Sequence, residues 1–551
     1  MTRAKAGLKR AKPAARRARR RGAARPARNA AAGQKPRRAA PVRVAGRPGA
    51  IRRVLIANRG EIAVRVIRTL RELGITSVAL FSEPDRAALH VLMADEAYPI
   101  GPGPARASYL DLDRVMSTAR RVRADAIHPG YGFFAENPAF ARACESAGIT
   151  FIGPSSDTIA ALGDKLAARA AAKRAGVPLI PGSPGPVATL DEARAVAQRI
   201  GWPVMLKAAA GGGGRGMRIV RSAQELEAAW GMTRGEAQAA FADDRVYLER
   251  AIERPRHVEA QILADGRGNV AFLGERECSI QRRHQKLLEE TPSPAFDPKL
   301  RARFGAAACR IAKHVGYRSA GTVEFIMDEE KNFYFLEVNT RLQVEHPVTE
   351  MVTGLDLVAE QIAIAAGGSF TFGRKAPEPR GWSIEARVIA EDPAVNFMPS
   401  VGRIERVRLP QGPGVRNDSG IYRGYEVPVH YDSLLAKLVV WGADREQARR
   451  RLLRALDEYV LDGPRHNLAF HRWLAAHPAF AAGDLSTGFL DQHFKPAALA
   501  PGSESAEVAV LAAALHAREE RLRVALPNGD GAGDRSAWRW LDRRRRVRTR
   551  V

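Results

Sequence analysis

Residues 333–339 form one of the most apolar segments of the chain, but polar side chains stand at its C-terminal end. This segment reads F-Y-F-L-E-V-N, and its aromatic and aliphatic residues predict a strand buried on both faces. Glu337 and Asn339 have the parity of Phe333 and Phe335, so simple alternation predicts that all four share one face. Because an unpaired buried carboxylate is costly, the pattern predicts a bound cation beside Glu337.

A second apolar segment, residues 321–328, carries the lone Glu324. Two strand-borne carboxylates and the amide oxygen of Asn339 are hard ligands of the kind that Mg²⁺ or Mn²⁺ prefers. The alternative, that both glutamates end in solvent, stays open on these residues alone. Further polar residues follow within seven positions of Asn339: Arg341, Gln343, Glu345 and His346. This concentration favours a site for an anionic substrate.

Length and composition restrict the class of protein. The 551 residues suffice for about three or four domains. No apolar run approaches the roughly 20 residues that span a bilayer, so a soluble protein is expected. Cys144, Cys278 and Cys309 form no C-x-x-C pair, which favours neither a disulfide framework nor a zinc site. A cytoplasmic location is therefore predicted.

The formal charge of +27 is concentrated at one end. Residues 1–50 hold 17 Lys or Arg and no acidic residue, and this basic arm is predicted to be disordered. An extension without function, a polyanion-binding tail and a targeting peptide all stay open. Nucleic-acid binding by the arm is the less favoured interpretation. Residues 496–551 are predicted to be poorly ordered, apart from one helix near residues 506–523.

Strands and helices alternate from Ile51 onward, which predicts a parallel sheet of Rossmann type over residues 51–162. The expected elements are a strand at 54–57, a helix at 60–73, a strand at 75–81, and strands ending at 128 and 152. The first turn has a single glycine, so the dinucleotide fingerprint G-x-G-x-x-G is absent. Tyr131 follows the strand that ends at His128, at the edge where such sheets bind ligands. A plain turn explains it equally well.

A glycine tract, Gly211–Gly214, forms the tip of a predicted hairpin whose first strand segment, residues 204–210, carries Lys207. Its N–H groups suit phosphates, although no Walker motif G-K-[S/T] occurs and an ordinary flexible loop stays open. The donor-rich run at residues 275–286 is interpreted as an anion-binding wall rather than a solvated face. A later strand at residues 383–390 carries Arg387.

Long motifs in a fixed order identify a resemblance. They are I-A-N-R-G-E-I-A (56–63), H-P-G-Y-G-F (128–133), K-A-A-A-G-G-G-G-R-G-M (207–217), E-C-S-I-Q-R-R-H-Q-K (277–286), E-V-N-T-R-L-Q-V-E-H-P-V-T-E (337–350) and Y-D-S-L-L-A-K-L (431–438). From about Arg53 to Phe494 the chain resembles biotin carboxylase, the ATP-grasp component of acetyl-CoA carboxylase and of related acyl-CoA and pyruvate carboxylases.

This resemblance implies a multidomain protein of α/β and α+β class. A Rossmann-like domain (51–162) would precede an ATP-grasp domain (163–375) with a mobile lid at about 180–252 and a C-terminal biotin carboxylase domain (376–495). The family often has Ser-Gly where this chain has Ala209 and Ala210, and lysine where Arg250 stands. These differences from the family pattern would affect the movement of the lid.

The resemblance also implies roles for individual residues. ATP would contact Lys165, Lys207, Gly213, Gly214, Glu249, His257, Gln281, His284, Glu324 and Glu337. The metal would be held by Glu324, Glu337 and Asn339. Bicarbonate would contact Lys286, Arg341, Gln343 and Val344, with Glu345 as its base. Tyr131 and Arg387 would lie near biotin, and the catalytic set would be Lys286, Arg341, Glu345 and Arg387.

The implied activity is that of an ATP-dependent ligase that carboxylates biotin through carboxyphosphate, using ATP, Mg²⁺ or Mn²⁺ and bicarbonate. After Lys437 the next lysine is Lys495, and no M-K-M tripeptide occurs, so biotin is expected on a separate carrier protein. A carboxyltransferase partner and a homodimer are further expectations. A component of a pyruvate carboxylase-type complex and another ATP-grasp ligase are the alternatives.

Overall fold

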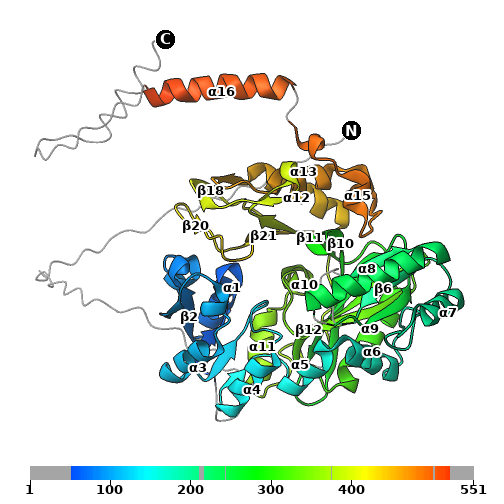
Figure 1. The fold of residues 1–551 in the computed structure, drawn as a ribbon. Coiled ribbons are helices and arrows are strands. Elements are labelled where there is room, and N and C mark those ends of the chain that lie inside the picture. The colour runs from blue at the N-terminus through cyan, green and yellow to red at the C-terminus, as the bar shows by residue number, and fades with distance from the viewer. Residues whose placement is uncertain (1–50, 210–215, 242, 374, 501–502, 522–551) are drawn as a thin grey trace, which may run out of the picture. The chain divides into compact units, whose positions relative to one another are not determined.

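A computed structural model describes residues 51–209, 216–241, 243–373, 375–500 and 503–521 (Figure 1). Gly213 and Gly214 of the predicted lid tip, the basic arm of residues 1–50 and residues 522–551 lie outside the described residues. The predictions made for them stay predictions.

The N-terminal part is a parallel sheet with helices between its strands, as the sequence predicts. Its spatial order is β3-β2-β1-β4-β5. The strands are β1 (Arg53–Ile56), β2 (Thr76–Ser82), β3 (Glu96–Gly101), β4 (Ala126–His128) and β5 (Thr150–Phe151), and the helices are α1 (Gly60–Glu72), α2 (Leu89–Met93), α3 (Leu112–Arg121), α4 (Pro138–Ser146) and α5 (Ser156–Gly163). The turn that contains Tyr131 therefore lies at the carboxyl edge of β4, where ligands bind in open sheets.

A small antiparallel sheet in the order β7-β6-β8 contains the hairpin predicted around the glycine tract. Its elements are β6 (Val204–Ala208), β7 (Met217–Val220) and β8 (Val246–Arg250), with α6 (Lys165–Arg174), α7 (Leu190–Ile200) and α8 (Ala223–Phe241). The two strands predicted on either side of residues 210–215 are confirmed, and they pair antiparallel.

An eight-stranded antiparallel sheet carries seven of the predicted site residues: His257, Gln281, Lys286, Glu324, Glu337, Asn339 and Arg387. Its order is β13-β12-β9-β10-β11-β14-β21-β19. The strands are β9 (Arg256–Ala264), β10 (Val270–Arg282), β11 (Gln285–Thr291), β12 (Ser319–Met327), β13 (Phe333–Asn339), β14 (Trp382–Ile389), β19 (Val415–Ser419) and β21 (Leu434–Gly442). The helices α9 (Pro298–His314), α10 (His346–Thr353) and α11 (Leu357–Ala365) accompany it. Because β11 pairs with β14, the ATP-grasp and C-terminal parts share one sheet.

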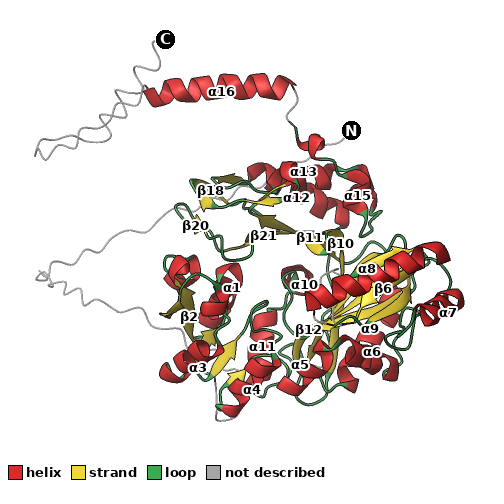
Figure 2. Ribbon diagram, in the orientation of Figure 1, coloured by secondary structure: helices red, strands yellow, loops and turns green. Residues whose placement is uncertain are grey.

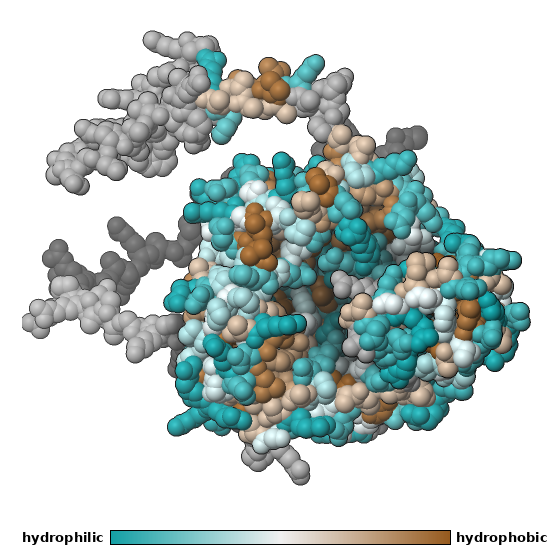
Figure 3. Space-filling model, viewed as in Figure 1, coloured by the Kyte–Doolittle hydropathy of each residue, from teal (hydrophilic) through white to brown (hydrophobic). Residues whose placement is uncertain are grey.

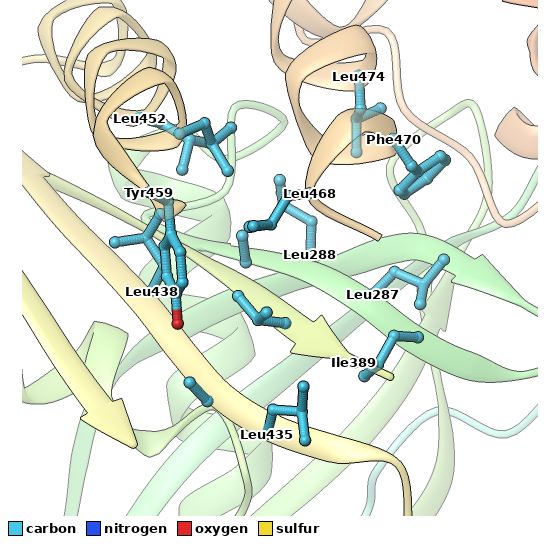
Figure 4. Packing of buried hydrophobic residues seen from close by; sticks show 14 of the residues in the cluster. Leu287, Leu288, Ile389, Leu435, Leu438, Leu452, Tyr459, Leu468, Phe470 and Leu474 are labelled. Atoms are coloured by element: carbon cyan, nitrogen blue, oxygen red, sulfur yellow. The ribbon is translucent and has the colours of Figure 1, made fainter. Parts of the chain in front are cut away.

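The C-terminal part packs helices against β14 and β21 (Figure 2). Helix α12 (Arg445–Glu458) makes direct contacts with both strands, and α13 (Leu468–Ala476), α14 (Pro478–Ala482) and α15 (Phe489–His493) follow it, with α16 (Ser503–Arg521) last in the chain. The short strands are β15 (Glu391–Asp392), β16 (Met398–Pro399), β17 (Gly402–Arg403), β18 (Arg406–Arg408), β20 (Glu426–Val427) and β22 (Val460–Asp462). Leu438 of the sheet and Leu452 and Leu474 of the helices belong to one buried cluster (Figure 4). This core packs the helices against β14 and β21.

A β-bulge corrects the alternation predicted for β13. Phe335 pairs with Phe325 and Glu337 pairs with Glu324, so Leu336 is the extra residue. Directly paired residues share a face and neighbouring residues along a strand do not. Glu337 therefore lies on the face opposite Phe335, and the predicted common face is wrong. Leu336 is also only partly buried, so the strand is not buried throughout on both faces.

A second bulge acts in the same way on β11. Gln281 pairs with Lys286 and Ile280 pairs with Leu288, which leaves Leu287 as the extra residue. Without it Lys286 would share the face of Leu288, which belongs to the hydrophobic core. The bulge instead turns Lys286 to the opposite face. Bulges of this kind re-aim side chains beside functional sites.

Polar and charged residues cover most of the visible face of the molecule (Figure 3). Within the described residues, no helix combines the length and the apolar character that crossing a membrane would need.

Candidate active site

A cavity of about 490 Å³ opens where the N-terminal turn, the large sheet and the C-terminal part meet. Its walls include Glu61 and Tyr131 from the N-terminal part, Lys286, Arg341 and Val344 from the central part, and Arg387 and Tyr431 from the C-terminal part. Cationic groups from separate segments thus line one partly open cavity, which suits a small anion.

Lys286 is the centre of the charged cluster beneath this cavity. Its ammonium donates to Glu259 at 2.6 Å, to Glu324 at 2.9 Å and to Glu345 at 2.7 Å. Burial alone would lower the pKa of Lys286, but these three carboxylates raise it well above its usual range. The ammonium is therefore charged throughout the physiological range and holds three acidic side chains together.

Glu345 is clamped between two cations. Its Oε1 accepts from Lys286, and its Oε2 accepts from an Arg387 guanidinium nitrogen at 3.0 Å. Burial would raise the pKa of Glu345, but Lys286, Arg387 and Arg276 hold it well below its usual range. The carboxylate is thus ionised and ready to accept a proton, although the two clamps weaken its basicity.

Arg387 is itself fixed from below. Its Nε donates to Glu289 at 2.6 Å, and burial raises the pKa of the Glu289 carboxyl to about 7, with Arg387 opposing and Glu345 adding to the rise. One level deeper, Arg276 is fully buried and donates from Nε to Glu259 at 2.5 Å. Buried arginines with several bonded partners orient the groups above them.

Arg341 is positioned by the N-terminal part of the chain. Its Nε donates to Glu136 at 2.8 Å, and its other nitrogens donate to Gln343 Oε1 at 2.9 Å and Asn339 Oδ1 at 3.2 Å. Glu136 also accepts from the backbone N–H of Thr340 at 2.9 Å. This arrangement fixes the guanidinium at the cavity wall.

Glu324 and Glu337 fit a divalent cation. They occupy directly paired positions on one face of β12 and β13, and burial together with the Glu324 carboxylate raises the pKa of Glu337. A divalent cation that prefers oxygen ligands would offset this repulsion. The nearby group of His257, Glu259 and Glu324 fits less well, because the Lys286 ammonium pairs with both of its carboxylates, whereas of Glu324 and Glu337 it pairs with Glu324 alone.

The residues expected around ATP lie on both the small and the large sheet. Lys207 on β6 donates to Glu249 on β8 at 2.5 Å, and His257 on β9 lies 3.0 Å from Glu324. The remaining described members are Lys165 at the start of α6, Gln281 on β10, His284 in the β10–β11 turn and Glu337 on β13. These residues therefore come from the small sheet, from α6 and from the large sheet.

One carboxyl of the cavity wall predicts a pH dependence of stability. Burial raises the pKa of Glu61 to about 7, with Asp418 adding and Lys437 and Arg416 opposing. The folded state then binds this proton more strongly than the unfolded state, so the stabilisation is full below about pH 4.5 and lost as the pH rises through about 7. The loss is on the order of 3 kcal/mol.

We therefore expect the melting temperature of the wild type to fall relative to that of E61Q between pH 5 and pH 8, by a few degrees. Thermal unfolding across this range measures the difference. The exposed Glu227 supplies a control, since E227Q should leave the slope unchanged. Parallel curves for wild type and E61Q would contradict the prediction.

Three family models match consecutive parts of the chain. They are the biotin carboxylase N-terminal domain at residues 50–159, the ATP-binding domain of the carbamoyl-phosphate synthase L chain at 164–371, and the biotin carboxylase C-terminal domain at 385–492. The chain belongs to the biotin carboxylase family. The two flanking matches remove the alternative of an unrelated ATP-grasp ligase.

Similar proteins agree with the family assignment. Biotin carboxylase 1 of Bacillus subtilis is 52% identical over 444 residues, covering 80% of this chain and 99% of that protein. A pyruvate carboxylase subunit of Methanothermobacter thermautotrophicus is also 52% identical, over 80% of this chain and 90% of the relative.

Solved structures of biotin carboxylases match the described fold. A biotin carboxylase complex with β-γ-ATP from Campylobacter jejuni has a TM-score of 0.78 at 44% identity and covers 81% of this chain and 99% of its own. The biotin carboxylase domain dimer of Hydrogenobacter thermophilus 2-oxoglutarate carboxylase, with MgADP, ADP and bicarbonate, has a TM-score of 0.78 at 48% identity, covering 82% and 100%. The three-domain architecture and the ATP-dependent ligase class are confirmed.

The structure brings most of the predicted biotin carboxylase residues together. Lys286, Arg341, Val344, Arg387 and Tyr131 line one cavity, and Glu345 lies beneath it. Several residues of this centre were missed as site members: Glu136, Glu259, Arg276, Glu289 and Lys437. A charge inside an apolar strand was the available signal for Glu259, whereas Arg276 stands between Glu275 and Glu277 in the donor-rich run. The run at residues 275–286 is buried over residues 275–281, which excludes a solvated face there.

Proposed function

We propose that this chain is a biotin carboxylase subunit that uses ATP and bicarbonate to carboxylate biotin held on a separate carrier protein. The arrangement of Lys286 and Arg387 around Glu345, beneath a cavity lined by cations, carries the proposal. We further propose a carboxyltransferase partner, a homodimer and a cytoplasmic location. The dimer described for the 2-oxoglutarate carboxylase domain supports the homodimer.

Bicarbonate would be held by Lys286, Arg341, Gln343 and Val344, and Glu345 would take its proton. A substrate anion that shares Lys286 with Glu345 weakens the hold of the ammonium on the carboxylate. This raises the pKa of Glu345 toward the range that a general base needs. The resting clamp thus keeps the carboxylate ionised, and substrate binding makes it more basic.

Arg387 would face the enolate oxygen of biotin, and Tyr131 would contact the ring at the cavity mouth. Glu324, Glu337 and Asn339 would hold Mg²⁺, which neutralises phosphate charge when ATP is bound. Lys207, Glu249, His257 and Gln281 would hold the nucleotide.

Incubation with ATP, Mg²⁺, free biotin and labelled bicarbonate tests the function. Label in biotin together with bicarbonate-dependent ATP hydrolysis is the expected result, and neither would appear if the proposal were wrong. The comparisons do not favour the pyruvate carboxylase-type alternative, since relatives of both kinds share 52% identity.

The proposed metal site predicts that E337Q raises the Mg²⁺ concentration required for half-maximal ATP hydrolysis by about tenfold or more and lowers kcat, because one of two carboxylate ligands loses its charge. Titration of Mg²⁺ at saturating ATP measures both. E329Q, at an exposed carboxylate between β12 and β13, is the matched control. A wild-type Mg²⁺ dependence for E337Q would remove Glu337 from the ligand set.

A further inference from the structure

Lys437 on β21 is fully buried, yet the proposed mechanism gives it no role. Its ammonium donates to the backbone carbonyl of Val344 at 2.9 Å and lies 3.2 Å from a carboxylate oxygen of Glu61. The ring centroid of Tyr131 is 5.7 Å away. One side chain therefore contacts the start of α1, the turn after β4 and the loop before α10.

The loop from Gln343 to Glu345 is held at each residue. The Nδ1 of His346 lies 2.8 Å from the Gln343 carbonyl, and burial with the nearby cations lowers the pKa of His346 well below its usual range. A neutral ring can therefore donate its Nδ1 proton to that carbonyl. Lys437 holds the next carbonyl, and Lys286 and Arg387 hold the Glu345 carboxylate.

Register on the large sheet explains why Lys437 reaches this loop. Lys437 pairs directly with Arg387 on β14 and with Asp418 on β19. Directly paired residues point to the same face of a sheet. Neighbouring positions of the sheet thus hold consecutive residues of the loop: Arg387 the side chain of Glu345, and Lys437 the main chain of Val344.

We propose that Lys437 is a positioning residue for the bicarbonate site. It fixes the Val344 carbonyl and so sets the direction in which Val344 and Glu345 face the cavity, without touching substrate. The inference rests on the proposed function, because Val344 and Glu345 receive their roles there. The competing explanation is charge balance alone, in which Lys437 serves only to neutralise the Glu61 carboxylate, 3.2 Å away.

K437M removes the donor and keeps the length of the side chain. Since small misplacements of catalytic groups cost up to about 100-fold, we expect the KM for bicarbonate to rise by about 10- to 100-fold. The KM for ATP should stay within about threefold, because none of the expected nucleotide residues that the structure describes contacts Lys437. K375M, at an exposed lysine, is the matched control.

The double variant K437M/E61Q separates positioning from charge balance, because it removes both members of the buried ion pair. Positioning predicts that the melting temperature recovers relative to K437M while the KM for bicarbonate stays high. Recovery of both quantities would establish charge balance and overturn the inference. The double variant also serves if K437M alone does not fold.

Steady-state kinetics on the full chain distinguish a failure of this inference from a failure of the proposed function. A wild type without bicarbonate-dependent ATP hydrolysis would overturn the proposed function and, with it, the basis for this role. An active wild type with a K437M variant whose KM for bicarbonate lies within twofold would overturn the positioning role alone.

Discussion

Replacing Glu345 with glutamine is expected to reduce bicarbonate-dependent ATP hydrolysis and biotin carboxylation by roughly two to four orders of magnitude, the contribution of a general base. The amide keeps the volume of the side chain but cannot accept the proton. It also presents an NH₂ group toward a site where Lys286 and Arg387 both donate. Nucleotide binding should change by less than about threefold, because no described contact joins Glu345 to the nucleotide residues on β6 and β8.

E289Q is the matched comparison for this variant. Glu289 shares Arg387 with Glu345. It does not line the cavity, so it is not expected to accept the bicarbonate proton. We expect E289Q to lose no more than about tenfold in kcat. Equal losses in the two variants would mean that charge around Arg387, and not the basicity of Glu345, limits the reaction. Near-full turnover of E345Q would remove the base assignment outright.

Replacing Lys286 with methionine is expected to have the largest combined effect on activity and stability. Three carboxylates lose their shared cation, and removing one partner of a buried ion pair costs about 3–5 kcal/mol. Activity should fall below detection, since the bicarbonate site loses its central cation. The melting temperature should fall by several degrees.

The loss of stability in K286M should depend on pH, and the three carboxylates that surround Lys286 determine whether it grows or shrinks as the pH rises. Without the ammonium, the pKa values of Glu259, Glu324 and Glu345 rise, because like charges then face one another in a buried site. A bound proton can replace the lost positive charge at low pH, so the loss should be larger at pH 8 than at pH 5.5. Calorimetry at both pH values measures it, with K375M as the control. A loss independent of pH would show that Lys286 acts by packing alone.

Local sequence was sufficient for the strands and for the kinds of side chain that meet at the site. The predicted strand at residues 333–339 coincides with β13, and the strand expected at 383–390 is β14 with Arg387 on it. Charges within apolar segments were informative because burying them without partners is costly. The family motifs supplied the roles, and the family and the three-domain architecture are confirmed by the comparisons.

Two single-residue bulges were beyond what periodicity could predict. Simple alternation places Glu337 with Phe335 and Lys286 with Leu288, but the extra residues Leu336 and Leu287 reverse both faces. A bulge is selected by the pairing partner and by packing around it, so the strand's own sequence carries little sign of it.

The sequence by itself thus determined that acidic and basic side chains would gather at the end of an apolar strand pair. A buried charge without a partner is costly, so groups of opposite charge are expected beside it. Only the tertiary structure decided which partners these are. Lys286, Glu345, Arg387 and Lys437 come from separate elements, and their contacts depend on the register of β14 against β21 and on the loop before α10. Register and burial are long-range properties of packing, and they set both the direction of each side chain and its pKa.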